Sequence, residues 1–138
     1  MDDAKKELVQ SWLIKATHDI KAAEKLAHIS DPVLDVAIYH CQQGAEKAIK
    51  GFLVFHDQQF EKTHDIEQLL TSAGDIDKNM LRWIEAGEYL SPYVSLFRYP
   101  GAVMEPSEEE FEHALFMAKD LFKMITSILP KEVLPTEI

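Results

Sequence analysis

A stripe of polar side chains runs along one side of the stretch 39–53, YHCQQGAEKAIKGFL. In a helix, at about 100° per residue, six positions fall within an arc of roughly 120°. They are His40, Gln43, Gly44, Lys47, Lys50 and Gly51. Ammonium, imidazole and amide donors side by side are suited to holding a phosphate or another anion. The same stripe is also typical of the solvated face of a bundle helix, so both interpretations stay open.

The two glycines in this stripe favour a contact over a solvated face. Each glycine in a helix interior costs about 1 kcal/mol relative to alanine. In open solvent Gly44 and Gly51 would only weaken the helix, whereas beneath a second backbone or a ligand they allow close approach. We therefore expect a packed partner helix, a bound polyanion, or both, on this side.

Asp19 is the second residue whose position calls for an explanation. It projects into the apolar arc of the stretch 3–28, between Trp12 and Leu26. A buried carboxylate left without a partner costs about 3–5 kcal/mol, so a donor should face it. It could be a structural link between two helices, or it could orient a basic side chain towards a ligand. The candidate partners are His40, Gln43, Lys47 and Arg98.

The segment LFRYPG, residues 96–101, places Arg98 and Tyr99 in a stretch rich in proline. Guanidinium is a rigid fork that suits phosphate, and tyrosine offers a face on which a base can stack. Arg98 could equally serve only to tie this loop down. His64 and Asp65 in EKTHDIEQLL are natural capping residues for a short helix, with a catalytic dyad as the alternative.

Metal and cofactor chemistry find little support in the sequence. The six histidines form no i, i+4 pair, and Cys41 is the single cysteine. A phosphate-binding Walker loop, a dinucleotide fingerprint and a nucleophile elbow are all lacking. We expect no metal site and no cofactor.

Apolar residues recur at helical spacing along most of the chain, and no alternation predicts a strand. The pattern predicts an all-α fold, an antiparallel up-and-down bundle of about five helices, three of them long, in a single domain over residues 1–138. We expect shorter helices to cover one end of the bundle and the tail after Pro130 to be frayed. The expected helices span about 3–28, 32–56, 63–74, 77–89 and 107–129, with caps at Ser30 or Asp31, Thr63 and Ser107.

Charge and length limit the possible functions. The chain has 138 residues and a net charge of −10, which argues against a general nucleic-acid binder because duplex affinity depends largely on Lys and Arg. Any anion site must therefore be local. The absence of long apolar runs and of a targeting segment, together with the single cysteine, leads us to expect a soluble cytoplasmic protein that does not enter a membrane.

Four stretches together resemble the HEPN domain family. They begin at Trp12 (WLIKATHDIKAAEKL), Ala37 (AIYHCQQGAEKAIKGFLVFH), Phe60 (FEKTHDIEQLL) and Phe97 (FRYPG). The resemblance implies a helical bundle that is usually a homodimer and that binds nucleotides or RNA. It also implies a possible nucleotidyltransferase partner in an arrangement like a toxin–antitoxin pair. Many members of the family are metal-independent RNases.

The catalytic pattern of the RNase branches is not carried over. Those branches have an Arg followed, after a short polar spacer, by a His, whereas Arg98 is followed by YPGAVMEP and Arg82 by WIEAGEY. We therefore expect a protein without strong catalysis that binds a nucleotide, an RNA segment or a nucleotidyltransferase. A metal-independent RNase and a pure protein-interaction module are the alternatives. The residues that the resemblance carries over as ligand-binding are Asp19, His40, Gln43, Lys47, Lys50, His64, Arg98 and Tyr99.

Overall fold

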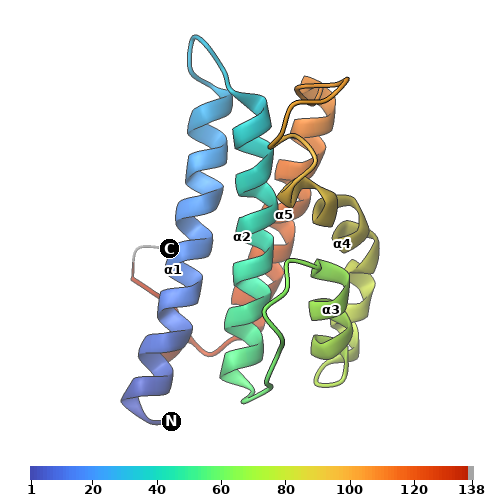
Figure 1. Cartoon of the computed structure of the whole chain (residues 1–138). Coiled ribbons are helices and arrows are strands. Elements are labelled where there is room, and N and C mark those ends of the chain that lie inside the picture. The colour runs from blue at the N-terminus through green and yellow to red at the C-terminus, as the bar shows by residue number, and fades with distance from the viewer. Residues whose placement is uncertain (137–138) are drawn as a thin grey trace.

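The computed structural model describes residues 1–136 and confirms the all-α bundle (Figure 1). Three long helices form the bundle: α1 runs antiparallel to both α2 and α5, so α2 and α5 run parallel to each other, which corrects the fully antiparallel arrangement expected from the sequence. Of the two short helices, α3 packs beside α2, and α4 packs on α3 and α5, so both cover a flank of the bundle rather than an end. No strand occurs among the described residues. The helices are α1 (Asp3–Ala27), α2 (Leu34–Phe55), α3 (Ile66–Gly74), α4 (Ile84–Leu90) and α5 (Glu108–Ile128).

Side-chain caps fix where several of these helices begin. The backbone N–H of Lys5 donates to Asp2 at the start of α1, and that of Glu110 donates to Ser107 at the start of α5, as expected for Ser107. Asp65, not Thr63, caps α3 by accepting from the N–H of Gln68. At α2 the capping residue is Val33, which has no side-chain acceptor, so the caps predicted at Ser30 or Asp31 are wrong.

Two other expectations about local structure need correction. The predicted fourth helix begins as a 3₁₀ turn over Lys78–Trp83 and becomes α-helical only in α4. Within that turn Met80 is buried, but Leu81 is exposed. The described part of the tail is not frayed, because a 3₁₀ turn at Lys131–Val133 holds Val133 in the core.

The core lies where α1, α5 and the short helices meet α2. Its large, fully buried side chains come from every helix, with Phe52 and Phe111 the largest. Because α2 has neighbours on several sides, few of its positions are exposed. Among residues 1–136, no helix is long and apolar enough to cross a membrane.

Cys41 provides a direct chemical test of this packing. It lies inside α2, and burial raises the pKa of its thiol to about 12. Because the thiolate is the reactive form, we expect iodoacetamide to leave the native thiol unmodified at about pH 8 and to alkylate it fully in denaturant. Intact-mass spectrometry would measure both. Rapid alkylation of the native protein would show that α2 is not covered as described.

Candidate functional site

The glycines of α2 lie against α1 of the same chain. A Cβ atom added at Gly44 would lie 2.9 Å from Cγ1 of Ile20 and 3.4 Å from the backbone oxygen of Ala16. One added at Gly51 would lie 3.2 Å from Cβ of Trp12. The packed partner helix expected from the sequence is therefore α1. The glycines bring two backbones together, and this close approach sets the positions of the polar side chains beside them.

Asp19 links the two helices through both of its oxygens. Its Oδ1 lies 2.7 Å from Nδ1 of His40, and its Oδ2 accepts from Nζ of Lys47 at 2.6 Å. Asp19 is buried, while His40 and Lys47 are half-buried. The expected partner for this carboxylate is confirmed, with two of the four candidates filling the role. The arrangement holds one imidazole and one ammonium side by side at the surface.

A second polar network is centred on Glu46, which the sequence analysis does not single out. Its carboxylate is 3% exposed and accepts from Nζ of Lys50 at 2.9 Å. It also lies 2.8 Å from Nδ1 of His64 and accepts from Nε2 of Gln42 at 3.1 Å. Gln42 in turn accepts from Nε2 of Gln43 at 2.7 Å. Glu46 therefore links His64 to Lys50, and together with Gln42 it links Gln43 to Lys50.

The i, i+4 spacing of Gln42, Glu46 and Lys50 is the signal that could have revealed this network. These positions lie one above another on a helix, and a Glu four residues before a Lys is a favourable pair. The spacing does not show that all three are buried. Burial follows from the segment 60–65, which returns along α2 and places the backbone oxygen of His64 3.0 Å from Nε2 of Gln42.

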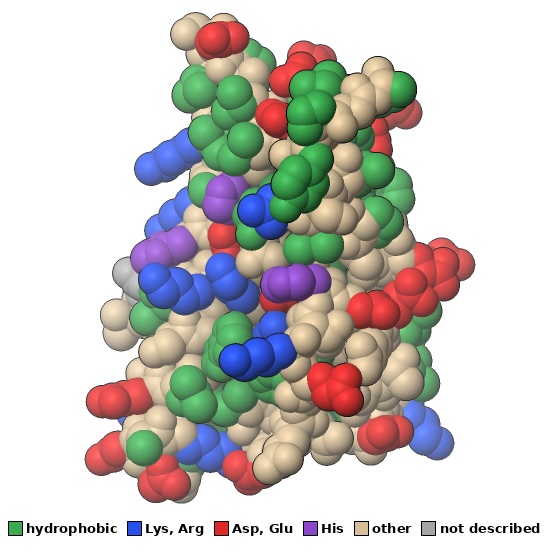
Figure 2. All heavy atoms as spheres, in the orientation of Figure 1, with side chains coloured by type: hydrophobic (Ala, Val, Ile, Leu, Met, Phe, Trp, Pro, Cys, Tyr) green, Lys and Arg blue, Asp and Glu red, His purple; other side chains and the backbone are tan. Residues whose placement is uncertain are grey.

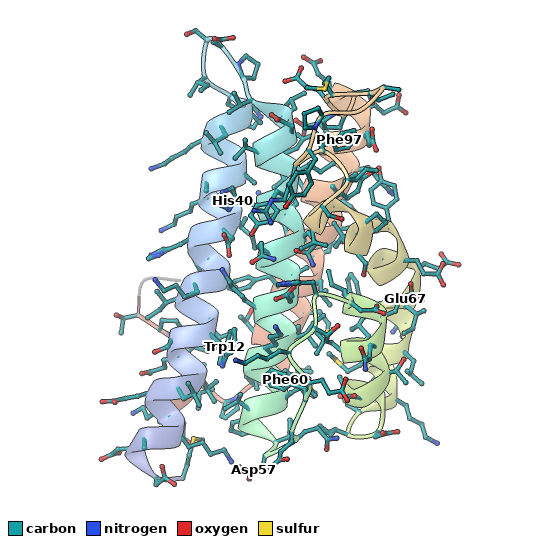
Figure 3. All side chains as sticks on the ribbon, viewed as in Figure 1. Trp12, His40, Asp57, Phe60, Glu67 and Phe97 are labelled. Atoms are coloured by element: carbon teal, nitrogen blue, oxygen red, sulfur yellow. The ribbon has the colours of Figure 1, made fainter. Side chains whose placement is uncertain are left out.

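Lys50 lies inside the bundle instead of facing a ligand. Its ammonium is 5.7 Å from the ring centroids of both Trp12 and Phe60. Figure 3 shows these two rings on the same side of the molecule, one from α1 and one from the segment after α2. Because it contacts both rings and pairs with Glu46, the ammonium is desolvated and fully partnered. Among the cations of the stripe, Lys47 is therefore the more accessible.

Arg98 and His40 meet at a small hollow on this face. The hollow has a volume of about 280 Å³ and is lined by Asp35, Val36, Tyr39, His40, Phe97 and Arg98. The guanidinium carbon of Arg98 lies 4.9 Å above the centroid of the Tyr39 ring. Within residues 1–136 no carboxylate forms an ion pair with Arg98, so its donors stay available. We call the six lining residues the Arg98 hollow.

Tyr99 is placed differently from its neighbour. Its side chain is 69% exposed, and it does not line the Arg98 hollow. The aromatic face beneath the guanidinium belongs to Tyr39, and a second ring, that of Phe97, lies beside it. Tyr39 and Phe97 are not among the predicted site residues. Their apolar surroundings in the sequence give no indication of this role.

The electrostatics of this face differ from those of the whole chain. Figure 2 shows Lys, Arg and His side chains gathered across the face formed by α1 and α2, with most visible Asp and Glu nearer its margins. Asp19 and Glu46 are each neutralised by a lysine, and Arg98 shares its hollow with one carboxylate, that of Asp35. The charges around the hollow are therefore balanced on a protein whose net charge is −10.

Two histidines on this face have the same arrangement. In both His40 and His64, Nδ1 is held by a buried carboxylate. Because a carboxylate only accepts hydrogen bonds, Nδ1 must carry a hydrogen and Nε2 is left to exchange a proton or bind an anion. The pair of His and carboxylate groups is thus suited to acid–base chemistry as well as to binding. Among the described residues, no group of three or more His, Cys, Asp and Glu could hold a metal ion.

Comparison with known proteins agrees with this architecture. The HEPN domain model matches residues 9–129. The protein belongs to the HEPN family. The resemblance seen in the four sequence motifs is thereby confirmed over most of the chain.

Two solved structures share the HEPN fold of this protein. TT1696 from Thermus thermophilus has a TM-score of 0.73 and 25% sequence identity, covering 88% of this chain and 98% of its own. ST0689, an archaeal HEPN homologue, has a TM-score of 0.66 and 25% identity, covering 86% and 95%. No curated protein matches the sequence.

Proposed function

We propose that this HEPN protein binds a nucleotide or a short segment of RNA through the Arg98 hollow and the adjoining face of α2. Arg98 and Nε2 of His40 contact phosphate, and Lys47 adds a second cation beside them. One observation carries the proposal: an arginine without an ion-pair partner among the described residues lies over the Tyr39 ring and shares a hollow with a histidine whose Nδ1 is fixed by Asp19. Such a rigid fork loses little freedom on binding a phosphate.

The size of the hollow favours a single unpaired nucleotide over duplex RNA. Pockets for drug-sized ligands occupy about 300–1,000 Å³, and this one, at about 280 Å³, holds one base or one phosphate group. The ring of Phe97 offers the base an apolar wall, and the guanidinium of Arg98 offers it a stacking plane. Duplex RNA hides its bases from such a hollow.

The other predicted ligand residues have supporting roles in this proposal. Asp19 holds His40 and Lys47 in place. Glu46 fixes His64 and Lys50 directly, and Gln43 is tied to Glu46 through Gln42. His64 and Tyr99 are exposed and are available to a longer RNA that continues from the hollow. The ligand thus meets a face whose donors are already oriented by buried carboxylates.

Replacing Arg98 with alanine tests the proposal. We expect the Arg98→Ala variant to bind a fluorescein-labelled single-stranded RNA about tenfold more weakly, because a charge-assisted contact is lost. The slope of log K against log salt should also fall by about one. Fluorescence anisotropy over a salt series measures both quantities.

Arg82→Ala is the matched control, since Arg82 is the only other arginine and is also exposed. It should bind RNA as the unchanged protein does. Equal loss in both variants, or none in either, would remove the Arg98 hollow as the ligand site. Lys47→Ala is a poorer test, because Lys47 is also the ion-pair partner of Asp19.

The two His and carboxylate pairs support a second candidate, a metal-independent RNase. Nε2 of one histidine would take the proton of a ribose 2′-hydroxyl, and the other would give a proton to the leaving oxygen. Arg98 would stabilise charge on the phosphate. The candidate is supported by the arrangement of His40 and His64 and lacks the family's Arg and His motif.

Under this second candidate we expect a structured RNA to be cleaved in the presence of a chelator. The His40→Gln variant should cleave at least about 100-fold more slowly, which is the usual contribution of general acid–base catalysis. Gel electrophoresis of labelled fragments measures the rate, and His18→Gln is the control, since His18 is also an exposed histidine of this chain. Intact RNA after long incubation would leave binding as the function.

We also propose that the protein is a cytoplasmic homodimer. Its partner would be a nucleotidyltransferase, in a toxin–antitoxin-like context, which the family resemblance supports. A pure interaction module is the third candidate: the same face would then dock a protein. In that case the partner would co-purify, and nucleotides would not shift the melting temperature of the protein.

A further inference from the structure

One wall of the Arg98 hollow comes from the segment between α4 and α5, and two aromatic contacts hold that segment. The guanidinium carbon of Arg98 lies 4.9 Å above the centroid of the Tyr39 ring, which belongs to α2. The ring of Phe97 is stacked on that of Tyr93, with 14° between the two planes and 5.9 Å between the centroids. Phe97 is half-buried and lines the same hollow as His40 (Figure 3). The position of this aromatic wall therefore depends on Tyr93.

Tyr93 is fixed in turn by a carboxylate of α5. It belongs to a 3₁₀ turn over Ser91–Val94 and is 5% exposed. Its hydroxyl donates a hydrogen bond to Oε2 of Glu110. Burial raises the pKa of the Tyr93 hydroxyl, and the bond to Glu110 raises it further, so the hydroxyl keeps its proton and remains the donor. Two consecutive contacts thus lead from Glu110 through Tyr93 to Phe97.

The backbone of Glu110 fastens the neighbouring helices without the help of its carboxylate. Its N–H donates to the Ser107 side chain and so caps α5. Its carbonyl oxygen accepts from the Tyr89 hydroxyl at 3.1 Å, which ties α4 to α5. Both bonds remain when the side chain is shortened. Within residues 1–136 the carboxylate takes part in no ion pair, so its removal acts on Tyr93 before anything else.

An aromatic wall binds a base well only when the ring is already in place. A ring that turns freely in solvent loses that freedom when a base stacks on it, and the loss weakens binding. The ring of Phe97 has lost this freedom before any ligand arrives, because it lies against a buried tyrosine whose hydroxyl is also held.

We propose that Glu110 is a positioning residue for the ligand site: through the Tyr93 hydroxyl it fixes the ring of Phe97, against which an unpaired base packs. This inference rests on the proposed function and deepens it. It concerns the base alone, because the phosphate contacts of the proposed site come from Arg98 and His40. Glu110 itself does not line the Arg98 hollow.

NMR spectroscopy tests these contacts without a ligand. We expect the ring resonances of Phe97 to shift in the Glu110→Ala variant, because the Tyr93 ring on which Phe97 stacks is released. Glu110→Gln should leave them in place, since an amide oxygen still accepts from the hydroxyl. Glu109→Ala is the matched control, because it removes the same charge from the first turn of α5 and Glu109 is exposed. Phe97 resonances that are equally unmoved in Glu110→Ala and Glu109→Ala would overturn the proposal.

Fluorescence anisotropy with the labelled single-stranded RNA measures the consequence for binding. Glu110→Ala and Tyr93→Phe should each bind about fivefold more weakly, a part of what stacking contributes per base. The double variant should lose little more, since both changes remove the same hydrogen bond. Glu110→Gln should bind as the unchanged protein does. The slope of log K against log salt should stay the same in all of them, because the phosphate contacts are kept.

The role of Glu110 and the proposed function fail in different ways. If Glu110→Ala binds RNA like Glu109→Ala while Arg98→Ala has lost affinity, only the role of Glu110 is overturned. A salt slope that falls in Glu110→Ala as it does in Arg98→Ala would also overturn it, because the whole segment would then have moved. If Arg98→Ala binds RNA as the unchanged protein does, the proposed site is wrong and the role of Glu110 is wrong with it.

Discussion

Replacing Glu46 with alanine is expected to lower the free energy of unfolding by about 3–5 kcal/mol. The carboxylate is 3% exposed, and the Lys50 side chain that it neutralises is 9% exposed. Without Glu46, that ammonium stays buried near Trp12 and Phe60 with no counter-charge. Gln42 also loses one of its two acceptors and keeps the backbone oxygen of His64. Urea denaturation followed by circular dichroism measures the change.

Glu24→Ala is the matched control for this experiment. Glu24 also pairs with a lysine, Lys119, at 3.3 Å, but its side chain is 39% exposed and that of Lys119 is 51% exposed. Exposed ion pairs contribute about 0–1 kcal/mol, so this variant should unfold almost as the unchanged protein does. Similar losses at Glu46 and Glu24 would contradict the burial of the Glu46 network.

A double variant separates the cost of an unpaired charge from the cost of a cavity. Glu46→Leu together with Lys50→Met replaces the ion pair with apolar side chains of similar size. Such replacements of buried ion pairs are often neutral or stabilising, so much of the lost stability should return. If the double variant is instead as unstable as Glu46→Ala, the hydrogen bonds to Gln42 and His64 carry the stability.

The helices are predictable from the sequence because their signals are local. The bounds of α1 and α5 agree with apolar periodicity and with the cap at Ser107 to within a residue or two. The sequence places the start of α2 too early, because Pro32 and the polar residues before it are typical starting signals. The structure begins that helix at Leu34 without a side-chain cap.

The site is predictable only where one residue contradicts its own helix pattern. Asp19 stands out because a carboxylate on an apolar face needs a partner, and periodicity on α2 then supplies His40 and Lys47. Glu46 does not stand out, because the segment that buries it comes from about twenty residues further along the chain. The ring beneath Arg98 is hidden for the same reason: Tyr39 and Arg98 are distant in sequence.

Gly44 is where packing between helices can be tested most directly. Replacing it with leucine is expected to lower the free energy of unfolding by about 1–3 kcal/mol, although leucine is the better helix former. Even a Cβ atom there would come within 2.9 Å of Ile20 and would push α1 away from α2. Asp19 would then be drawn away from His40 and Lys47, so RNA binding should weaken along with stability.

Gly101→Leu is the control, because a Cβ atom at Gly101 would meet nothing within 4 Å. Its effect should stay within about 0.5 kcal/mol. The clash itself is tested by combining Gly44→Ala with Ile20→Ala, which removes the atom that the new methyl group meets. The double variant should be more stable than the two separate losses predict, by at least about 0.5 kcal/mol. Strictly additive losses would mean that α1 does not pack on Gly44. The close approach of α1 and α2 would then not be what places Asp19 beside His40 and Lys47.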